Sequence, residues 1–202
     1  MDRHFSYGRD IESLDVALVD DAIGVVRIMR SILSGLGVAR VRTFAEPKLA
    51  LQCLLGEPPD LLVTNTRLSR SSGCRLVRMI RHQSLTPLCF VPAVIVSGHA
   101  RRRTVEEAFL SGAHQFLVLP LSPKAFGHRV EWLLRDDRKL LLEGERYVIE
   151  GVDEIVAASR GVPGRPRGLG DDTAGAPVPE APALPMDIFS ADPGGAKPVW
   201  EI

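Results

Sequence analysis

The sequence predicts an α/β fold, in which a doubly wound parallel sheet of five strands carries helices on both faces. Two observations support this prediction. Five short apolar runs of strand length recur between residues 14 and 134. A stretch with helical apolar spacing or a helix-start signal follows each run. Strands that alternate with helices in this way build a parallel sheet that is covered on both sides.

The first two strand–helix units span residues 16–55. Strand 16–19 ends at two aspartates, and apolar residues then recur at helical spacing until a pair of glycines near residue 36 can end the helix. Residues 38–44 alternate weakly, which is typical of an edge strand. Pro47 suits the first turn of a helix that continues to about residue 55.

The remaining three units follow the same plan. A buried-type strand that begins at residue 61 ends at Asn65, and Ser72 can cap the next helix. Strand 94–97 precedes the segment 104–107 (TVEE), which has the form of a capping box and predicts a helix that begins at Thr104. Strand 116–119 is followed by Ser-Pro and a helix that reaches residue 134.

The flanking segments are predicted to lie outside the sheet. Residues 1–13 are polar and favour a loose arm, and residues 135–150 favour a helical or irregular extension. Residues 151–202 contain 8 of the 15 prolines and 8 of the 18 glycines, a share that is typical of a disordered tail. The apolar segments 184–189 and 199–202 leave a short docking segment open as an alternative.

Composition favours a cytoplasmic protein without membrane or nucleic-acid contacts. The whole chain has 25 basic and 25 acidic residues, with a net charge of +4 over residues 1–150 and −4 over the tail. This contrast is too weak to indicate nucleic-acid binding. The three cysteines form no CxxC pair, which fits a reducing compartment. No signal-peptide core and no apolar run of membrane-spanning length occur.

The strand ends carry a series of motifs: LVDD with Asp20 and Asp21, PDLLVTN with Asn65, VIVSG with Ser97, and FLVLP with Leu119. In this order and spacing, residues 14–134 resemble the receiver domain of two-component response regulators. The resemblance implies the CheY-like, or flavodoxin-like, fold with strand order 2-1-3-4-5.

The resemblance also implies a chemistry, phosphoryl transfer from a histidine kinase to an aspartate at the end of the third strand. In that family the acidic pair and this aspartate hold Mg²⁺, a Ser or Thr after the fourth strand and a Lys after the fifth contact the phosphoryl group, and an aromatic residue, here Phe116, acts as a switch. Asn65 replaces the aspartate and Leu119 replaces the lysine. A neutral amide cannot form an acyl phosphate, so we expect no conventional phosphorylation, no catalytic residues and at most weak Mg²⁺ binding by Asp20 and Asp21.

Two interpretations of this pocket are open. In the first, Asn65 donates its amide hydrogens to the acidic pair, and Arg67 supplies part of the missing metal charge. Without a counter-cation, Asp20 and Asp21 would raise each other's pKa. In the second, the pocket is an eroded remnant that is kept only for folding.

Charge is the second unusual feature, because no Asp or Glu occurs between residues 61 and 103 while arginines are frequent. They predict either a rim that binds an anion or an acidic partner, or a solvated face. A helix that starts at Thr104 would place the Arg101–Arg103 run outside the positive end of its dipole. The arginines are Arg67, Arg70, Arg75, Arg78, Arg81, Arg101, Arg102 and Arg103.

The leading functional hypothesis is a receiver-like signalling protein that acts by phosphorylation-independent protein binding. Its expected partner is a histidine kinase or a downstream regulator. The contact face, which would also serve a homodimer, is formed by the fourth helix, fifth strand and fifth helix, with Arg101–Arg103, Phe109, Phe116 and Phe126. One alternative is a conventional single-domain regulator that is phosphorylated at a non-standard acceptor. A flavodoxin-like nucleotide enzyme fits poorly, because the loop after the first strand is acidic and lacks glycines.

Overall fold

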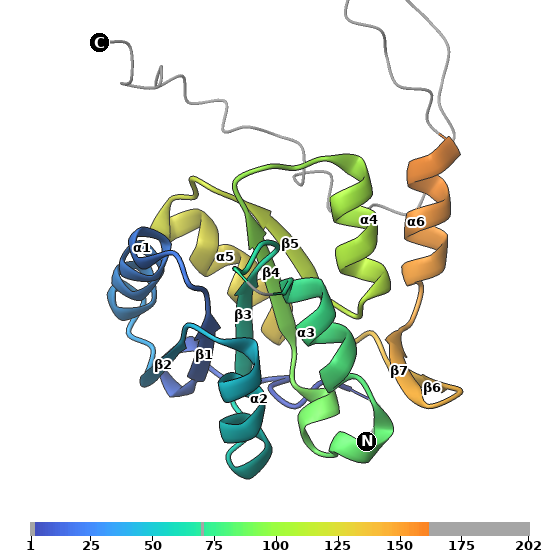
Figure 1. Ribbon diagram of the computed structural model, residues 1–202, viewed down its shortest axis with the longest axis horizontal. Coiled ribbons are helices and arrows are strands. Elements are labelled where there is room, and N and C mark those ends of the chain that lie inside the picture. Colours follow the sequence, from blue (N-terminus) through green and yellow to red (C-terminus); the bar gives the residue numbers. More distant parts are fainter. Residues whose placement is uncertain (1–2, 70, 162–202) are drawn as a thin grey trace, which may run out of the picture.

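A five-stranded parallel sheet forms the centre of the molecule (Figure 1). The structure, a computed structural model, describes residues 3–69 and 71–161. The strand order is β2-β1-β3-β4-β5, which confirms the predicted fold class and topology. The strands are β1 (Asp15–Val19), β2 (Arg40–Phe44), β3 (Leu61–Asn65), β4 (Ala93–Ser97) and β5 (Gln115–Val118).

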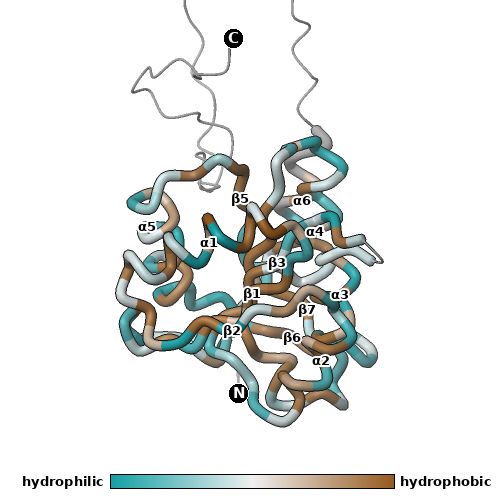
Figure 2. The backbone as a smooth tube through the Cα atoms, turned by 60° about the vertical axis from the view of Figure 1, so that its left-hand side comes forward, coloured by the Kyte–Doolittle hydropathy of each residue, from teal (hydrophilic) through white to brown (hydrophobic). Residues whose placement is uncertain are grey.

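Helices cover both faces of the sheet and enclose two separate apolar cores (Figures 1 and 2). On one face, α1 (Ile23–Gly35) and α5 (Pro123–Leu134) pack over the strands through side chains such as Leu33 and Phe126. On the other face, α2, α3 and α4 contribute Leu54, Ile80 and Phe109. Their bounds are α2 (Pro47–Gly56), α3 (Gly73–Ile80) and α4 (Arg102–Leu110).

Several helix starts are confirmed at the level of single hydrogen bonds. Ser72 caps α3 by accepting the backbone N–H of Arg75 at 3.2 Å, and Ser122 caps α5 by accepting that of Ala125 at 3.1 Å. Pro47 lies in the first turn of α2, as predicted. A side-chain oxygen that bonds a free N–H of the first turn stabilises a helix by about 1 kcal/mol.

The capping-box prediction for α4 is wrong. The helix begins at Arg102, with Arg101 as its N-cap residue and Thr104 already inside the first turn. Arg102 Nε donates to Glu106 Oε1 at 2.9 Å, and this ion pair one turn apart offsets part of the cost of placing cations at the positive end of the dipole. The arginine run therefore belongs to the helix start itself.

The N-terminal segment is an integral part of the fold, so the prediction of a loose arm is wrong. His4 and Ser6 are buried, and His4 Nε2 hydrogen-bonds the Leu133 carbonyl at 2.9 Å. The backbone N–H of Phe5 donates to Phe90 O, and that of Gly8 to Leu134 O, both at 2.8 Å. Apolar periodicity cannot reveal this segment, because the residues that fix it bond through polar groups. A short 3-10 helix, η1 (Ile11–Ser13), leads into β1.

The segment after α5 forms a hairpin and a helix, which corrects the predicted domain boundaries. Strands β6 (Leu140–Glu143) and β7 (Arg146–Ile149) pair antiparallel, and Gly144 adopts φ +61° in the turn between them. Helix α6 (Val152–Gly161) follows, inside the stretch that was predicted to be tail. Val152 and Val156, one turn apart, are buried and hold it to the domain. The predicted disordered tail from residue 162 to 202 lies outside the described residues.

Two further 3-10 turns, η2 (Gln83–Leu85) and η3 (Leu88–Phe90), connect α3 to β4. Among the helices of the described ranges, none has the length and apolar character that a membrane crossing requires.

Candidate functional site

Three predicted site residues meet at one edge of the sheet because they end three adjacent parallel strands. Asp20 follows β1, Asn65 ends β3 and Ser97 ends β4, and these strands lie side by side in the order β1-β3-β4. The carboxyl ends of parallel strands are the usual location of binding sites in such sheets. The predicted constellation is therefore assembled in space.

The side chain of Asn65 links this edge directly to the acidic pair. Its Nδ2 donates to Asp20 Oδ2 at 2.9 Å, the hydrogen bond expected from the sequence. The other Asp20 oxygen, Oδ1, accepts the backbone N–H of Ala22 at 2.8 Å, and Asp20 is 2% exposed. Asn65 Oδ1 accepts the backbone N–H of Arg67 at 3.2 Å. The amide thus satisfies a buried carboxylate that would otherwise lack a partner on that side.

Thr66, which the sequence did not single out, ties the amide to the fourth strand. Its hydroxyl donates to Ser97 Oγ at 2.9 Å and lies 3.4 Å from Asn65 Oδ1. Ser97 Oγ also accepts the backbone N–H of His99 at 3.2 Å. A threonine beside the acceptor position carries no distinctive pattern of its own, so only the fold reveals its role.

Asp21 is held separately from Asp20. Its Oδ2 accepts the backbone N–H of Ser69, in the loop between β3 and α3. Hydrogen bonds from the Ser69 side chain and backbone hold the pKa of the Asp21 carboxyl below its ordinary value. The sequence predicted that the paired aspartates would raise each other's pKa; for Asp21 this is wrong, because the Ser69 donors stabilise its charged form.

Arg67 does not contact the acidic pair through its side chain. The residue is exposed, and within residues 3–69 and 71–161 the structure contains no ion pair between its guanidinium and Asp20 or Asp21. Arg67 takes part in the site through its backbone N–H, which donates to Asn65 Oδ1, and not through its charged side chain. The expectation that Arg67 replaces a metal charge is therefore not met.

Gly73 sets the distance between the site and α3. A Cβ atom at this position would lie 2.3 Å from Asn65 O and 2.7 Å from Thr64 Cγ2, closer than any such contact allows. Thr64 is itself fixed, since its hydroxyl donates to Val19 O at 3.0 Å. Glycine is therefore required for α3 to begin directly against the end of β3.

The switch and lysine positions are both occupied by apolar side chains. Phe116 is 2% exposed and belongs to the core beneath α4. Leu119 packs against the opposite core, beside α5, and its backbone N–H donates to Ser97 O at 2.8 Å. No ammonium group therefore reaches the site from position 119.

The donor set does not fit a strong Mg²⁺ site. Mg²⁺ prefers six oxygen ligands in near-ideal octahedral geometry. Here the described part of the chain contains no group of three carboxylate, imidazole or thiolate ligands, and the two aspartates are already bonded by N–H donors. The Asn65 amide points a positive dipole at the oxygen that a metal would need, so no step is assigned to a metal ion.

The predicted arginine rim is only partly present. Arg67 and Arg101–Arg103 are exposed in loops or at the helix start on the carboxyl edge. Arg70 lies outside the described residues. Arg81, which the sequence grouped with Arg75 and Arg78 on one helical face, is instead completely buried at the opposite edge.

From that buried position, Arg81 binds two loops, one before β4 and one between α4 and β5. Its Nε donates to Gly112 O at 3.0 Å, and its NH1 donates to Cys89 O and Val91 O at 2.7 and 2.8 Å. NH2 lies 3.4 Å from His114 Nδ1. Burial lowers the pKa of the Arg81 guanidinium to about 10. This arginine organises the fold and is unavailable to a partner.

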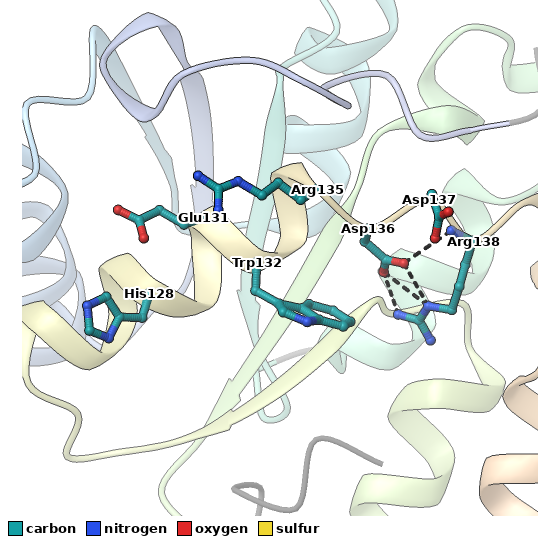
Figure 3. A pocket seen from close by; sticks show the side chains of 7 residues that line it. All are labelled: His128, Glu131, Trp132, Arg135, Asp136, Asp137 and Arg138. Atoms are coloured by element: carbon teal, nitrogen blue, oxygen red, sulfur yellow. Dashed lines mark hydrogen bonds and ion pairs between the residues drawn. The ribbon is translucent and has the colours of Figure 1, made fainter. Parts of the chain in front are cut away.

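A depression of about 400 Å³ lies near the end of α5 and is remote from Asn65 (Figure 3). The guanidinium of Arg138 stacks over the Trp132 indole, 5.6 Å from the ring centroid. The same guanidinium donates to the buried Asp136 carboxylate at 2.6 Å. These contacts fix the turn from α5 toward β6. The residues that line the depression are His128, Glu131, Trp132, Arg135, Asp136, Asp137 and Arg138.

Comparisons with known proteins agree with this geometry. The sequence profile of the response regulator receiver domain matches residues 16–131. The chemotaxis protein CheY of Pseudomonas aeruginosa is 25% identical over 118 residues, which is 58% of this chain and 94% of CheY. The "Probable transcriptional regulator ycf27" of Cyanophora paradoxa is 31% identical over 126 residues, 62% of this chain; the match spans only 50% of that relative's length.

Solved structures show the same fold. NtrX from Brucella abortus matches with a TM-score of 0.53 and 27% identity, over 60% of this chain and 27% of that one. Chemotaxis protein CheY4 of Vibrio cholerae matches with a TM-score of 0.55 and 22% identity, over 60% of this chain and 98% of that one. The β6–β7 hairpin and α6 lie after the last residue that the receiver profile matches.

Proposed function

Because the chain belongs to the response regulator receiver family, we propose that it is a two-component signalling protein that acts through protein contacts without phosphorylation at Asn65. The observation that carries the proposal is the hydrogen bond from Asn65 Nδ2 to Asp20 Oδ2. An amide in this position supplies no carboxylate nucleophile. Its N–H also occupies, by hydrogen bonding, a carboxylate oxygen that would help to hold a metal ion.

The closed network around Asn65 supports a fixed state rather than a triggered one. The Thr66 hydroxyl donates to Ser97 Oγ, and the Ser69 N–H donates to Asp21 Oδ2. The groups that would contact a phosphoryl group or its metal ion therefore already have partners within the chain. A satisfied polar network of this kind rigidifies its surroundings. In this proposal the receiver fold displays one constant surface to its partner.

The proposed partner is a histidine kinase or a downstream regulator in the cytoplasm. The exposed run Arg101–Arg103 offers positive charge that an acidic partner surface can complement. Three aromatic residues expected at the contact face cannot take part as they stand, because Phe109, Phe116 and Phe126 are 7%, 2% and 0% exposed. A homodimer through the same face would have to accommodate α6, which packs against α4.

Titration with Mg²⁺ and beryllofluoride, followed by NMR of the Ser97 and Phe116 amides, tests the proposal. We expect no saturable shift in the native protein. Asn65→Asp restores a carboxylate and should respond in part, since Leu119 still provides no ammonium group. Saturable shifts in the native protein would instead support a conventional regulator with a non-standard acceptor, and would overturn the proposal.

A further inference from the structure

Helix α6 covers one side of α4. It follows the β6–β7 hairpin and runs beside α4, and in both views α4 lies between α3 and α6 (Figures 1 and 2). Val152 and Val156 of α6 are 6% and 4% exposed, and they belong to the same apolar cluster as Val105 and Phe109 of α4. The helix is therefore packed on the domain rather than extended from it.

The covered side of α4 is the one that faces away from α3. Arg78 of α3 donates to Ser111 Oγ at 3.4 Å, which marks the side of α4 that faces α3. Phe109 precedes Ser111 by two residues, and two steps of a helix place it on nearly the opposite side. Phe109 is nevertheless only 7% exposed. Phe109 belongs to one apolar cluster with Phe116 of the sheet and with Val152 and Val156 of α6, so the sheet and α6 both contribute to its burial.

The contact of α6 is small and separable from the hairpin contact. Among the α6 side chains whose burial the structure describes, Val152 and Val156 are buried, and Asp153, Glu154 and Ala157 are exposed. The hairpin is anchored independently: Tyr147 N–H donates to Arg81 O at 2.8 Å, and the Tyr147 ring packs on Phe90 with centroids 4.7 Å apart. An element with few buried apolar contacts opens at lower cost than the core. Helix α6 can therefore detach while β6 and β7 stay in place.

We propose that the side of α4 under α6 is a docking surface for an amphipathic helix, and that α6 is its built-in, displaceable occupant. The surface is formed by Val105 and Phe109 of α4 with Leu140 and Ile149 of the hairpin. The occupant it fits is a helix with two small aliphatic side chains one turn apart, as α6 presents. A partner helix of this kind would bind by replacing α6. The surface is independent of Asn65 and goes beyond the proposed function.

The test uses the full chain with Val156→Asp, and Ala157→Asp as the matched control on the exposed side of the same helix. Hydrogen exchange should become at least about tenfold faster in residues 102–110 of Val156→Asp, because a buried charge expels α6. Exchange in α4 should be unchanged in Ala157→Asp. Slow exchange of β1 and β3 in both variants shows that the domain remains folded.

A fluorescently labelled peptide of residues 150–162 then probes the freed surface. It should bind Val156→Asp saturably and the native protein at least about tenfold more weakly, because the native site is already filled. Equal binding to both proteins, or to neither, would overturn the proposal. So would unchanged exchange in α4 of a folded Val156→Asp. If that variant unfolds altogether, Val156→Ala replaces it, and native-like exchange of α4 and α6 in Val156→Ala contradicts the proposal.

Discussion

The two edges of the sheet use polar residues in opposite ways. At the carboxyl edge, Asn65 bonds to the buried Asp20, Asp21 bonds to the exposed Ser69, and Arg101–Arg103 remain exposed. At the amino edge, Arg81 and His114 are completely buried. The same residue type, arginine, thus offers charge to a partner at one edge and holds loops together at the other.

The comparison shows how burial decides the role of a charged group. The pKa of His114 lies well below its ordinary value, first because of burial and then because Arg81, His4 and Arg138 oppose a further positive charge. Burial also lowers the pKa of His4, although Asp136 acts in the other direction. A neutral imidazole beside Arg81 leaves the guanidinium as the main charge of that cluster. The amino edge is therefore committed to stability and the carboxyl edge is free for contacts.

The largest expected effect is at the amino edge. Arg81→Met removes the donors of the Cys89, Val91 and Gly112 carbonyls and should lower the free energy of unfolding by about 3 to 5 kcal/mol. Urea denaturation measures it. Arg75→Met, on the exposed side of α3, is the control and should change stability by less than about 0.5 kcal/mol. Similar losses in both variants would erase the distinction between buried and displayed arginines.

The next effect tests the packing behind the carboxyl edge. Gly73→Ala places a methyl group against Asn65 O and Thr64, so α3 must shift, and we expect a loss of about 1 to 3 kcal/mol. Gly24→Ala meets nothing within 4 Å in α1 and should be neutral or stabilising by up to about 1 kcal/mol. Thermal unfolding compares the two variants. Equal stability would show that α3 does not need its close approach to β3.

Acidification should weaken the amino edge first. A histidine whose folded pKa is depressed is neutral in the folded state and charged in the unfolded state below about pH 6.5, so stability falls as pH falls. Each such histidine contributes a slope of up to about 1.4 kcal/mol per pH unit. Measurement of the unfolding free energy between pH 7 and pH 5 gives this slope. His114→Asn should reduce it by the contribution of at most about one proton.

The lowered pKa of the Asp21 carboxyl contributes in a separate range. Its stabilising effect is present above its ordinary value of 3.8 and is lost only as pH falls below that value. The change in unfolding free energy between pH 7 and pH 5 therefore reports on the histidines of the amino edge and not on Asp21. If His114→Asn leaves the pH dependence of the unfolding free energy unchanged, the assignment of this pH dependence to His114 is wrong.

The smallest effect concerns the network around Asn65. Thr66→Val keeps the shape of the side chain but removes its hydrogen bond to Ser97, and we expect a loss of about 1 kcal/mol. NMR should also show broadened or shifted Ser97 and His99 amide signals, since His99 N–H bonds the same oxygen. Thr43→Val, on the edge strand β2, is the matched control. If Thr66→Val lowered the free energy of unfolding as much as Arg81→Met does, the polar groups of the carboxyl edge would be as important for stability as those of the amino edge.

The sheet and its helices were predictable because apolar periodicity is a property of many residues together. The five strands, their order and the Ser72 cap follow from such patterns or from the family resemblance. Arg81 was misassigned because a helical wheel treats an arginine as exposed, whereas its donors here match three carbonyls. The start of α4 was predicted at the wrong residue because TVEE has the form of a capping box. The actual N-cap residue, Arg101, makes no side-chain hydrogen bond to the helix, so no sequence pattern marks it.

The candidate site was predictable in position but not in detail. Strand ends placed Asp20, Asn65 and Ser97 together, and the structure contains the Asn65–Asp20 bond. Thr66 and Ser69 act through single hydroxyl or backbone groups in loops, which leave no spacing to read. The hairpin β6–β7 and α6 were not predicted for another reason. Their short apolar pairs are too few to give a recognisable periodicity next to a segment rich in Pro and Gly.

The N-terminal segment has a consequence for synthesis on the ribosome. His4 is synthesised 129 positions before its hydrogen-bond partner, Leu133 O. Phe5 likewise waits for the Phe90 carbonyl. His4 must therefore remain unpaired until the end of α5 has left the exit tunnel, and by then all five strands of the sheet have emerged.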